Sequence, residues 1–211
     1  MEAEFWHERW SSNRIAFHEG RANKMLVTHF STLGLAPRSR VFVPLCGKTR
    51  DIAWLMEQGM QVAGAELSEL AVQQLFEEMS VHPEVSEAGP LKRYASAGID
   101  IYAGDIFALS ADLLGRVDAV FDRAALVALP GDMRPDYARH LTDITGTAPQ
   151  LLVTFEYDQS EMDGPPFSLS DDNVRSYYAE RYNAVVLSSV EVEGGLKGIC
   201  AAEERAWHLG S

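Results

Sequence analysis

The sequence predicts an α/β fold built on a doubly wound, largely parallel sheet, and three observations predict it. An apolar run over residues 40–43 breaks at Pro44, turns at Gly47 and continues as a helix-compatible segment that ends at Gly59. A second apolar segment ends in a carboxylate about 20 residues after that turn, a spacing typical of nucleoside-binding units. A Gly-Gly turn at 194–195 between two late apolar segments predicts a C-terminal antiparallel hairpin.

Length and composition limit the kind of protein this is. A chain of 211 residues can bury one α/β core but is short for two, so we expect a single domain over residues 1–211. The formal net charge of −13 comes without clusters of Lys and Arg. Because nucleic-acid binding draws on such clusters, we expect no nucleic-acid partner.

Cysteine usage and the N-terminus indicate the compartment. Cys46 and Cys200 lie in apolar segments without CxxC spacing, which predicts neither a disulfide framework nor a metal site. The acidic N-terminus has no apolar region after it, and no apolar run has the length of a membrane span. We therefore expect a cytoplasmic protein that does not associate with membranes.

The N-terminal segment, residues 1–34, is expected to cover the sheet domain. It carries several aromatic residues among polar neighbours, namely Trp6, Trp10, Phe17 and Phe30. These rings either pack this arm onto the sheet or line a pocket. Residues 23–33 have helical periodicity, and Gly34 ends the predicted helix.

The remaining elements follow from the same patterns. Helices are predicted over residues 69–79, 135–145 and 170–181, and strands over 61–66, 100–105, 117–122, 150–157, 184–192 and 197–207. Residues 80–98 are predicted to form an irregular connection because they contain several Pro and Gly residues. Residues 164–167, Gly-Pro-Pro-Phe, predict a stiff loop that is either a rim of the site or a rigid turn.

Side chains at the strand ends predict the type of ligand. Glu66 and Asp105 end two strands, and ligands of open α/β sheets bind at that edge. The turn offers only Gly47, so it matches neither the GxGxxG nor the GxxxxGK[ST] phosphate motif. A nucleoside without phosphates fits better. S-adenosylmethionine is such a ligand: Glu66 suits its ribose, Asp105 its adenine amine, and the Leu45–Gly47 backbone its amino-acid end. Cys46 is then a residue that packs the loop.

Motifs along nearly the whole chain resemble the thiopurine S-methyltransferase family, and specifically its bacterial members. They are Trp6-x-x-x-Trp10, Arg14-Ile15-Ala16-Phe17-His18, Val43-Pro44-Leu45-Cys46-Gly47-Lys48, Gly64-Ala65-Glu66-Leu67-Ser68-Glu69, Asp122-Arg123-Ala124-Ala125-Leu126-Val127-Ala128 and Gly164-Pro165-Pro166-Phe167. The resemblance implies a class I methyltransferase (Rossmann-like) fold, with a seven-stranded mixed sheet, a C-terminal antiparallel hairpin and an aromatic N-terminal arm.

Matching positions also imply a set of site residues. The cofactor S-adenosylmethionine is expected to contact Trp10, Leu45, Gly47, Glu66, Asp105, Ile106 and Arg123. The substrate is expected to contact Phe17, His18 and Phe167. Arg123 has three interpretations: a cofactor contact, a stabiliser of the incoming thiolate, or a structural ion pair with Asp122 or another neighbour.

The implied reaction is direct in-line transfer of the sulfonium methyl to the sulfur of thiopurines and other aromatic or heterocyclic thiols, or to selenium or tellurium species. A thiolate is already nucleophilic, so no catalytic base is assigned and His18 is not expected to be essential. The expected partner is a small-molecule thiol or selenol, and the expected state is a monomer. Two alternatives are a nicotinamide-dependent oxidoreductase and a protein that binds S-adenosylmethionine without catalysis.

Overall fold

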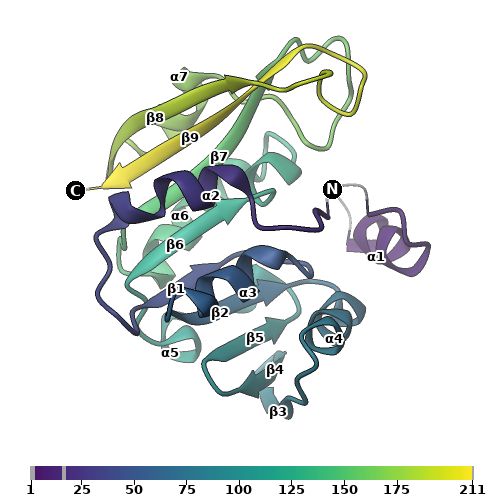
Figure 1. Cartoon of the computed structure of the whole chain (residues 1–211), viewed down its shortest axis with the longest axis vertical. Coiled ribbons are helices and arrows are strands. Elements are labelled where there is room, and N and C mark those ends of the chain that lie inside the picture. Colours follow the sequence, from purple (N-terminus) through teal and green to yellow (C-terminus); the bar gives the residue numbers. More distant parts are fainter. Residues whose placement is uncertain (1–2, 16–17, 211) are drawn as a thin grey trace.

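A mixed sheet of nine strands, in the order β3-β4-β5-β2-β1-β6-β7-β9-β8, runs through the computed structural model, which describes residues 3–15 and 18–210 (Figure 1). The parallel strands are β5 (Ile99–Ala103), β2 (Gln61–Glu66), β1 (Arg40–Val43), β6 (Ala119–Arg123) and β7 (Gln150–Tyr157). The antiparallel strands are β3 (Glu84–Ala88) and β4 (Leu91–Ser96) at one edge, and β9 (Ala202–Gly210) and β8 (Asn183–Glu191) at the other.

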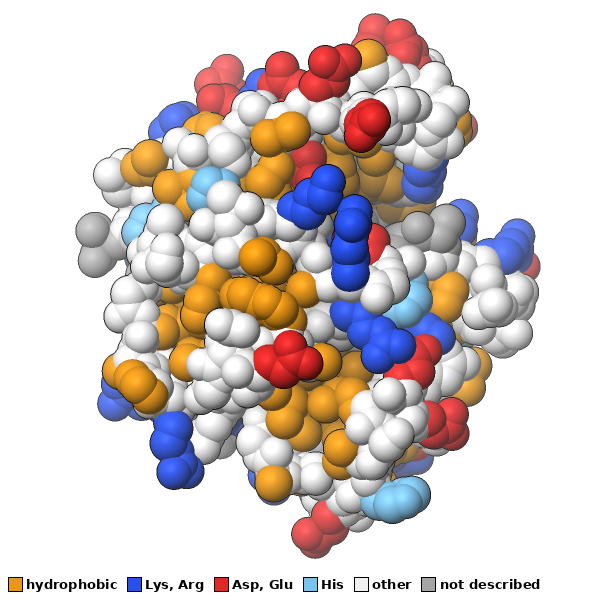
Figure 2. Space-filling view, in the orientation of Figure 1, with side chains coloured by type: hydrophobic (Ala, Val, Ile, Leu, Met, Phe, Trp, Pro, Cys, Tyr) orange, Lys and Arg blue, Asp and Glu red, His pale blue; other side chains and the backbone are white. Residues whose placement is uncertain are grey.

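Helices cover both faces of this sheet. One face carries α2 (Lys24–His29), η1 (Phe30–Leu33), α3 (Arg50–Glu57) and α4 (Glu69–Glu78). The other carries α5 (Ala111–Leu114), α6 (Arg134–Ile144) and α7 (Asp171–Tyr178), and the short helices η2 (Ile106–Ala108) and η3 (Leu126–Ala128) follow β5 and β6. Helix α1 (Ala3–Ser11) stands to one side, and Figure 2 shows a hollow between it and the loop that joins β8 to β9.

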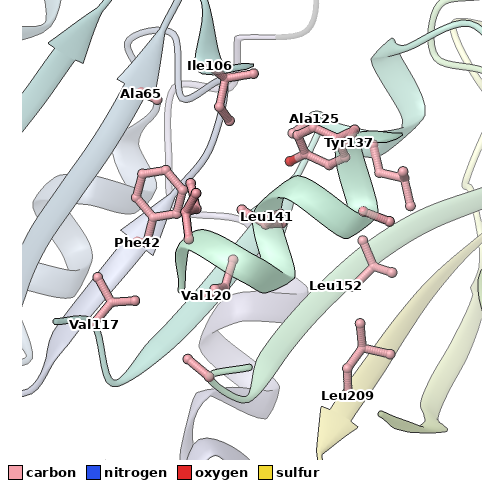
Figure 3. Close-up of a cluster of buried hydrophobic side chains, with 14 of the residues drawn as sticks. Phe42, Ala65, Ile106, Val117, Val120, Ala125, Tyr137, Leu141, Leu152 and Leu209 are labelled. Carbon is pink, nitrogen blue, oxygen red and sulfur yellow. The ribbon is translucent and has the colours of Figure 1, made fainter. Parts of the chain in front are cut away.

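Alternation along the strands divides the core into two layers. In β1, Phe42 points to the α6 side, whereas Val41 and Val43 point to the α3 side. Figure 3 shows the first layer, in which Phe42 lies near side chains of β6 and α6. Strands buried on both faces form nearly continuous apolar runs, which is why the sequence predicted β1, β6 and β7.

The fold class is confirmed, but the sheet has nine strands in the described residues, not seven. The difference is β3 and β4, in the segment that was predicted to be irregular. Its glycines mark turns: Gly89, with a φ of +63°, joins β3 to β4, and Gly98, with a φ of +81°, joins β4 to β5. In β3 the first four residues are exposed, so that strand lacks an apolar stripe.

The C-terminal hairpin is confirmed, with a longer loop than expected. The predicted strand over residues 197–207 begins only at Ala202. Residues 192–201 fold back on themselves, because the backbone N–H of Leu196 donates to the carbonyl of Cys200 at 2.8 Å. Gly195 allows this closure, since a Cβ atom there would lie 2.7 Å from that carbonyl oxygen. Within the described ranges, no helix has both the length and the apolar character needed to span a membrane.

Asp122, in β6, is a carboxylate that the fold encloses completely. It is 0% exposed and accepts hydrogen bonds from the backbone N–H of Leu126 at 3.1 Å and from the Tyr137 hydroxyl at 2.8 Å. Burial raises its pKa to about 6, although both hydrogen bonds act in the opposite direction. The carboxylate thus fixes the start of η3, directly after the strand end that carries Arg123.

The burial of Asp122 predicts that the stability of the protein depends on pH, and the Asp122→Asn variant should lack this contribution. Because the folded-state pKa is raised, Asp122 contributes stability that is fully present below about pH 4 and is lost as the pH rises through about 6. The free energy of unfolding of the variant, relative to wild type, should therefore rise by on the order of 2 kcal/mol between about pH 4 and about pH 7.5. Urea unfolding at both pH values measures it, with the exposed Asp132→Asn as control. If the free energies of unfolding of Asp122→Asn and wild type differed by the same amount at both pH values, the raised pKa of Asp122 would be contradicted.

Candidate active site

A cavity of about 1030 Å³ lies where the parallel strands end. Its walls include Val43 of β1, Glu66 of β2, Asp105 after β5 and Arg123 of β6, together with Trp10 of α1. The predicted cofactor residues Leu45, Gly47 and Ile106 also line it. The structure therefore brings together all of the residues predicted to contact the cofactor, because parallel strands deliver their carboxyl ends to one edge.

Glu66 is buried and connects two loops. Its Oε2 atom accepts a hydrogen bond from the backbone N–H of Gly47 at 2.8 Å, and its Oε1 atom accepts one from the backbone N–H of Ser68, also at 2.8 Å. Burial raises the pKa of this carboxyl, and the backbone donors, Ser68 first, act against that rise. Each carboxylate oxygen has two lone pairs, so each keeps an acceptor position. Two adjacent ligand hydroxyls would fit this arrangement.

The Trp10 side chain covers Gly47. A Cβ atom at Gly47 would lie 2.9 Å from the Cζ2 atom of Trp10, and the φ of +51° at Gly47 also favours glycine. Trp10 is only 4% exposed, so α1 is fastened to the loop that follows β1. Trp10, one of the residues expected to contact the cofactor, thus lies directly on the loop backbone.

Cys46, beside Gly47, is a packing residue, as predicted. It is buried, and a Cβ atom at Gly64 would lie 3.0 Å from its Sγ atom. Burial, and then the charge of Glu66, raise the pKa of the thiol well above its ordinary value. A neutral buried thiol is a poor nucleophile.

The residues after β5 form the next part of the wall. Asp105 is exposed to the cavity, and its Oδ1 atom accepts a hydrogen bond from the backbone N–H of Phe107 at 3.0 Å. Ile106 is buried, whereas Phe107 is 37% exposed and also lines the cavity. An acceptor carboxylate thus stands beside apolar surface, which suits a flat base that carries an amine.

Arg123 is paired with the N-terminal segment. Its guanidinium forms an ion pair with Glu19, whose side chain is 42% exposed, whereas the Arg123 side chain is 11% exposed. Asp122 faces Tyr137 and Leu126 instead, so the structural ion pair considered for Arg123 involves Glu19. Both partners line the cavity, so this pair connects β6 to the arm at the site itself.

The three predicted substrate residues have different positions. His18 lines the cavity, and its pKa is lowered, first by burial. Phe17 lies outside the described residues. Phe167 is absent from the cavity lining, and the Arg134 guanidinium lies 5.1 Å from its ring centroid, whereas Pro165 and Pro166 of the same loop do line the cavity. Its contact with substrate stays a prediction.

One group of site residues was missed in the sequence. Asp51, 2% exposed, accepts a hydrogen bond from the backbone N–H of Asn23 at 2.7 Å. The Asn23 side chain caps α2 by accepting from Met25, and it donates to Glu204 of β9 at 3.3 Å. Asn23 has the sequence signature of an N-cap, but no local pattern indicates its partners, which lie 28 and 181 residues away.

The comparisons with known proteins agree with this geometry. The family model described as thiopurine S-methyltransferase (TPMT) matches residues 1–209. The chain belongs to the thiopurine S-methyltransferase family. A protein of that name from Xanthobacter autotrophicus is 57% identical over 210 residues, which are 99% of this chain and 99% of that protein. Family membership makes the chain a methyltransferase with S-adenosylmethionine as its cofactor, and it replaces the oxidoreductase alternative.

Solved structures show the same fold at low sequence identity. A 1,6-didemethyltoxoflavin-N1-methyltransferase from Burkholderia thailandensis, with bound 1,6-didemethyltoxoflavin and S-adenosylhomocysteine, has a TM-score of 0.68 at 15% identity, over 99% of this chain and 87% of that one. An S-adenosylmethionine-dependent methyltransferase from Anabaena variabilis has a TM-score of 0.67 at 13% identity, over 99% and 95%. Across the described part of this family member, no group of three or more His, Cys, Asp or Glu side chains is arranged to hold a metal ion.

The contact between Trp10 and Gly47 predicts the effect of Gly47→Ala. The added Cβ atom would displace the indole, so the Kd for S-adenosylmethionine, measured by calorimetry, should rise at least about tenfold, the equivalent of about 1.4 kcal/mol. Gly59→Ala is a matched control, since Gly59 has a φ of +80° but nothing within 4 Å of a Cβ position. Equal affinities of the two variants would show that the Trp10 contact is unimportant for binding.

Proposed function

We propose that this protein transfers the methyl group of S-adenosylmethionine to the sulfur of thiopurines and other aromatic or heterocyclic thiols, and to selenium or tellurium compounds of similar size. The observation that carries the proposal is the single cavity that extends from Glu66 to the apolar loop at Pro165. Its volume of about 1030 Å³ is at the upper end of the range for one drug-sized ligand, so it has room for a nucleoside and a second aromatic molecule.

The cofactor would occupy the part of the cavity between β1 and β5. Glu66 has one acceptor position on each oxygen for the ribose hydroxyls, and Asp105 has acceptor oxygens for the adenine amine. Ile106 and Phe107 offer apolar surface for the base. Leu45 and Gly47 line the neighbouring wall, on which the amino-acid end would lie.

The acceptor would occupy the part of the cavity beyond β6. Apolar residues there come from η3, the loop between η3 and α6, β7 and the residue 164–167 loop, namely Val127, Leu129, Met133, Phe155, Pro165 and Pro166. The backbone N–H of Phe167 donates to the Val127 carbonyl at 2.7 Å, which holds that loop beside η3. An aromatic thiol would be held by apolar burial and desolvated there, with Phe17, His18 and Phe167 as proposed contacts.

The chemistry needs positioning more than acid–base groups. S-adenosylmethionine, when bound, supplies an electrophilic methyl group on a sulfonium sulfur. The walls of the cavity would hold the thiolate in line with that methyl and exclude water, an effect that can be worth roughly 7 to 11 kcal/mol. Arg123 would hold the cofactor or the thiolate, and its pairing with Glu19 fixes its place in the wall. We further propose that the protein works as a cytoplasmic monomer in detoxification, in line with its two free cysteines.

The deciding experiment is incubation with methyl-labelled S-adenosylmethionine and a panel of thiopurines, aryl thiols, and selenium and tellurium compounds. The proposal predicts labelled thioether products. Tight binding of S-adenosylmethionine without labelling of any acceptor would favour a non-catalytic binding protein instead.

A second prediction concerns Glu66→Ala. The variant loses a charge-assisted acceptor for the ribose, so the Kd for S-adenosylmethionine should rise about 10- to 100-fold, the equivalent of roughly 1.5 to 3 kcal/mol. Because Glu66 also holds Gly47 and Ser68, the variant needs a control that loosens the same region. Ser68→Ala removes the hydroxyl that caps α4 but leaves the carboxylate in place. Calorimetry should show near-normal affinity for Ser68→Ala, and an equal loss in both variants would remove Glu66 from the binding site.

A further inference from the structure

Two cations at the acceptor end of the cavity are not matched by carboxylates. Arg9 of α1 and Lys197 of the β8–β9 loop both line the cavity. Neither has an acidic group within 4.0 Å among the described residues, although Glu191 and Glu193 line the same region. By contrast, Lys48 in the same cavity is paired with Glu78 at 2.7 Å.

The chain is strongly acidic, with 31 Asp and Glu against 18 Lys and Arg. Acidic side chains are therefore plentiful in this chain, and an excess of basic residues cannot explain why Arg9 and Lys197 have no acidic partner in the described part of it.

Both side chains are held in place by contacts that leave their charge unneutralised. The Arg9 guanidinium lies 4.6 Å from the ring centroid of Phe5, and its Nε atom is buried without a hydrogen-bond partner in the described structure. The Lys197 Nζ atom donates to the Pro165 carbonyl at 2.5 Å, which uses one of its three donors. Pro165 belongs to the apolar acceptor wall, so this bond places the ammonium beside that wall.

The two cations line one cavity, and the charge of Arg9 acts on Lys197. The pKa of Lys197 is lowered, first by burial and then by the charge of Arg9. Lys197 has a φ of +54°, a left-handed conformation that is unfavourable for a residue with a Cβ atom. Two cations that line one cavity, one of them on left-handed backbone, are features that cluster at functional sites, and an anionic group is the ligand that both would attract.

We propose that Arg9 and Lys197 form a subsite for an anionic substituent, such as a carboxylate, on the aromatic thiol that accepts the methyl group. The inference rests on the proposed function and narrows its substrate class to aryl or heteroaryl thiols that carry a negative group away from the sulfur. The aromatic body would lie against Pro165, Pro166 and Trp6, and the anion would bind the guanidinium and the ammonium.

A pair of isosteric substrates tests the subsite. The carboxylate of 4-mercaptobenzoate is ionised at neutral pH, whereas 4-mercaptobenzamide has nearly the same shape without the charge. Wild type should have a higher kcat/KM for the carboxylate. Arg9→Gln and Lys197→Gln should each lower that value by about tenfold, the loss of one charge-assisted hydrogen bond, and change the value for the amide by less than about twofold.

Two further variants and one affinity measurement complete the test. Lys197→Arg should retain the preference, and Arg139→Gln, which removes an exposed cation on α6, should leave it unchanged. The Kd for S-adenosylmethionine should stay within about twofold of wild type in both subsite variants, as one lost charge-assisted bond to the cofactor would cost about tenfold. Equal losses for both substrates, no loss for either, or a raised Kd for S-adenosylmethionine would each overturn the subsite.

Binding without turnover separates this proposal from the proposed function. If wild type methylates no thiol, the proposed function fails, but calorimetry with 4-(methylthio)benzoate and 4-(methylthio)benzamide still measures the subsite. Tighter binding of the carboxylate, lost in Lys197→Gln, would support the anion subsite. Equal binding of the two compounds would overturn it.

Discussion

The Glu66 carboxylate is the contact on which the site depends. It satisfies the backbone N–H groups of Gly47 and Ser68, in the loops that follow β1 and β2, from a position that is 5% exposed. A buried carboxylate is costly unless it is hydrogen-bonded, and a buried N–H is costly unless it finds an acceptor, so each of these groups needs the others. Trp10 of α1 packs on Gly47, whose backbone N–H is held by Glu66. The position of α1 therefore depends indirectly on the Glu66 carboxylate.

The sheet and the N-terminal arm are stabilised by different sets of interactions. The sheet is held by two apolar layers, which its strands separate by simple alternation. The second half of the arm joins one of these layers through Met25, Leu26 and Leu33, whereas the part before residue 23 is held by Trp10 and by the ion pair of Glu19 with Arg123. Ion pairs that reach solvent contribute little to stability. With so few buried apolar contacts, the part of the arm before residue 23 is expected to open at a lower free energy than the sheet, a property that suits a segment over a ligand site.

Sequence reasoning recovered the parts of the site that depend on strand order. Glu66 and Asp105 were predictable because strand ends in a parallel sheet converge, whatever the details of packing, whereas Arg123 was predicted from the family resemblance. Gly47 was predictable because the turn after β1 needs it. Contacts between distant segments were not predictable, and the ion pair of Arg123 with Glu19 is an example. The chain has many acidic residues, and only the path of the arm in the folded protein brings Glu19 to Arg123.

The β3–β4 hairpin and Phe167 show two other limits. β3 is an edge strand with little buried apolar surface, so backbone hydrogen bonds to β4 hold it in the sheet. Such bonds require no particular side chains, so no pattern in the sequence predicts the strand. For Phe167, the sequence predicted the stiffness of the loop but not the contact of the ring with Arg134, which lies on another element.

The link between Asn23 and Glu204 has a consequence for how the protein is made. It joins residues 181 positions apart, and His29 bonds Ser188 across 159 positions at 2.7 Å. Ser188 and Glu204 both line the cavity, so this part of its wall can form only after most of the chain has been made, and it depends on non-local contacts, which form slowly. A ligand that binds this cavity stabilises those late contacts by mass action, so the supply of cofactor in the cell also acts on the yield of folded protein.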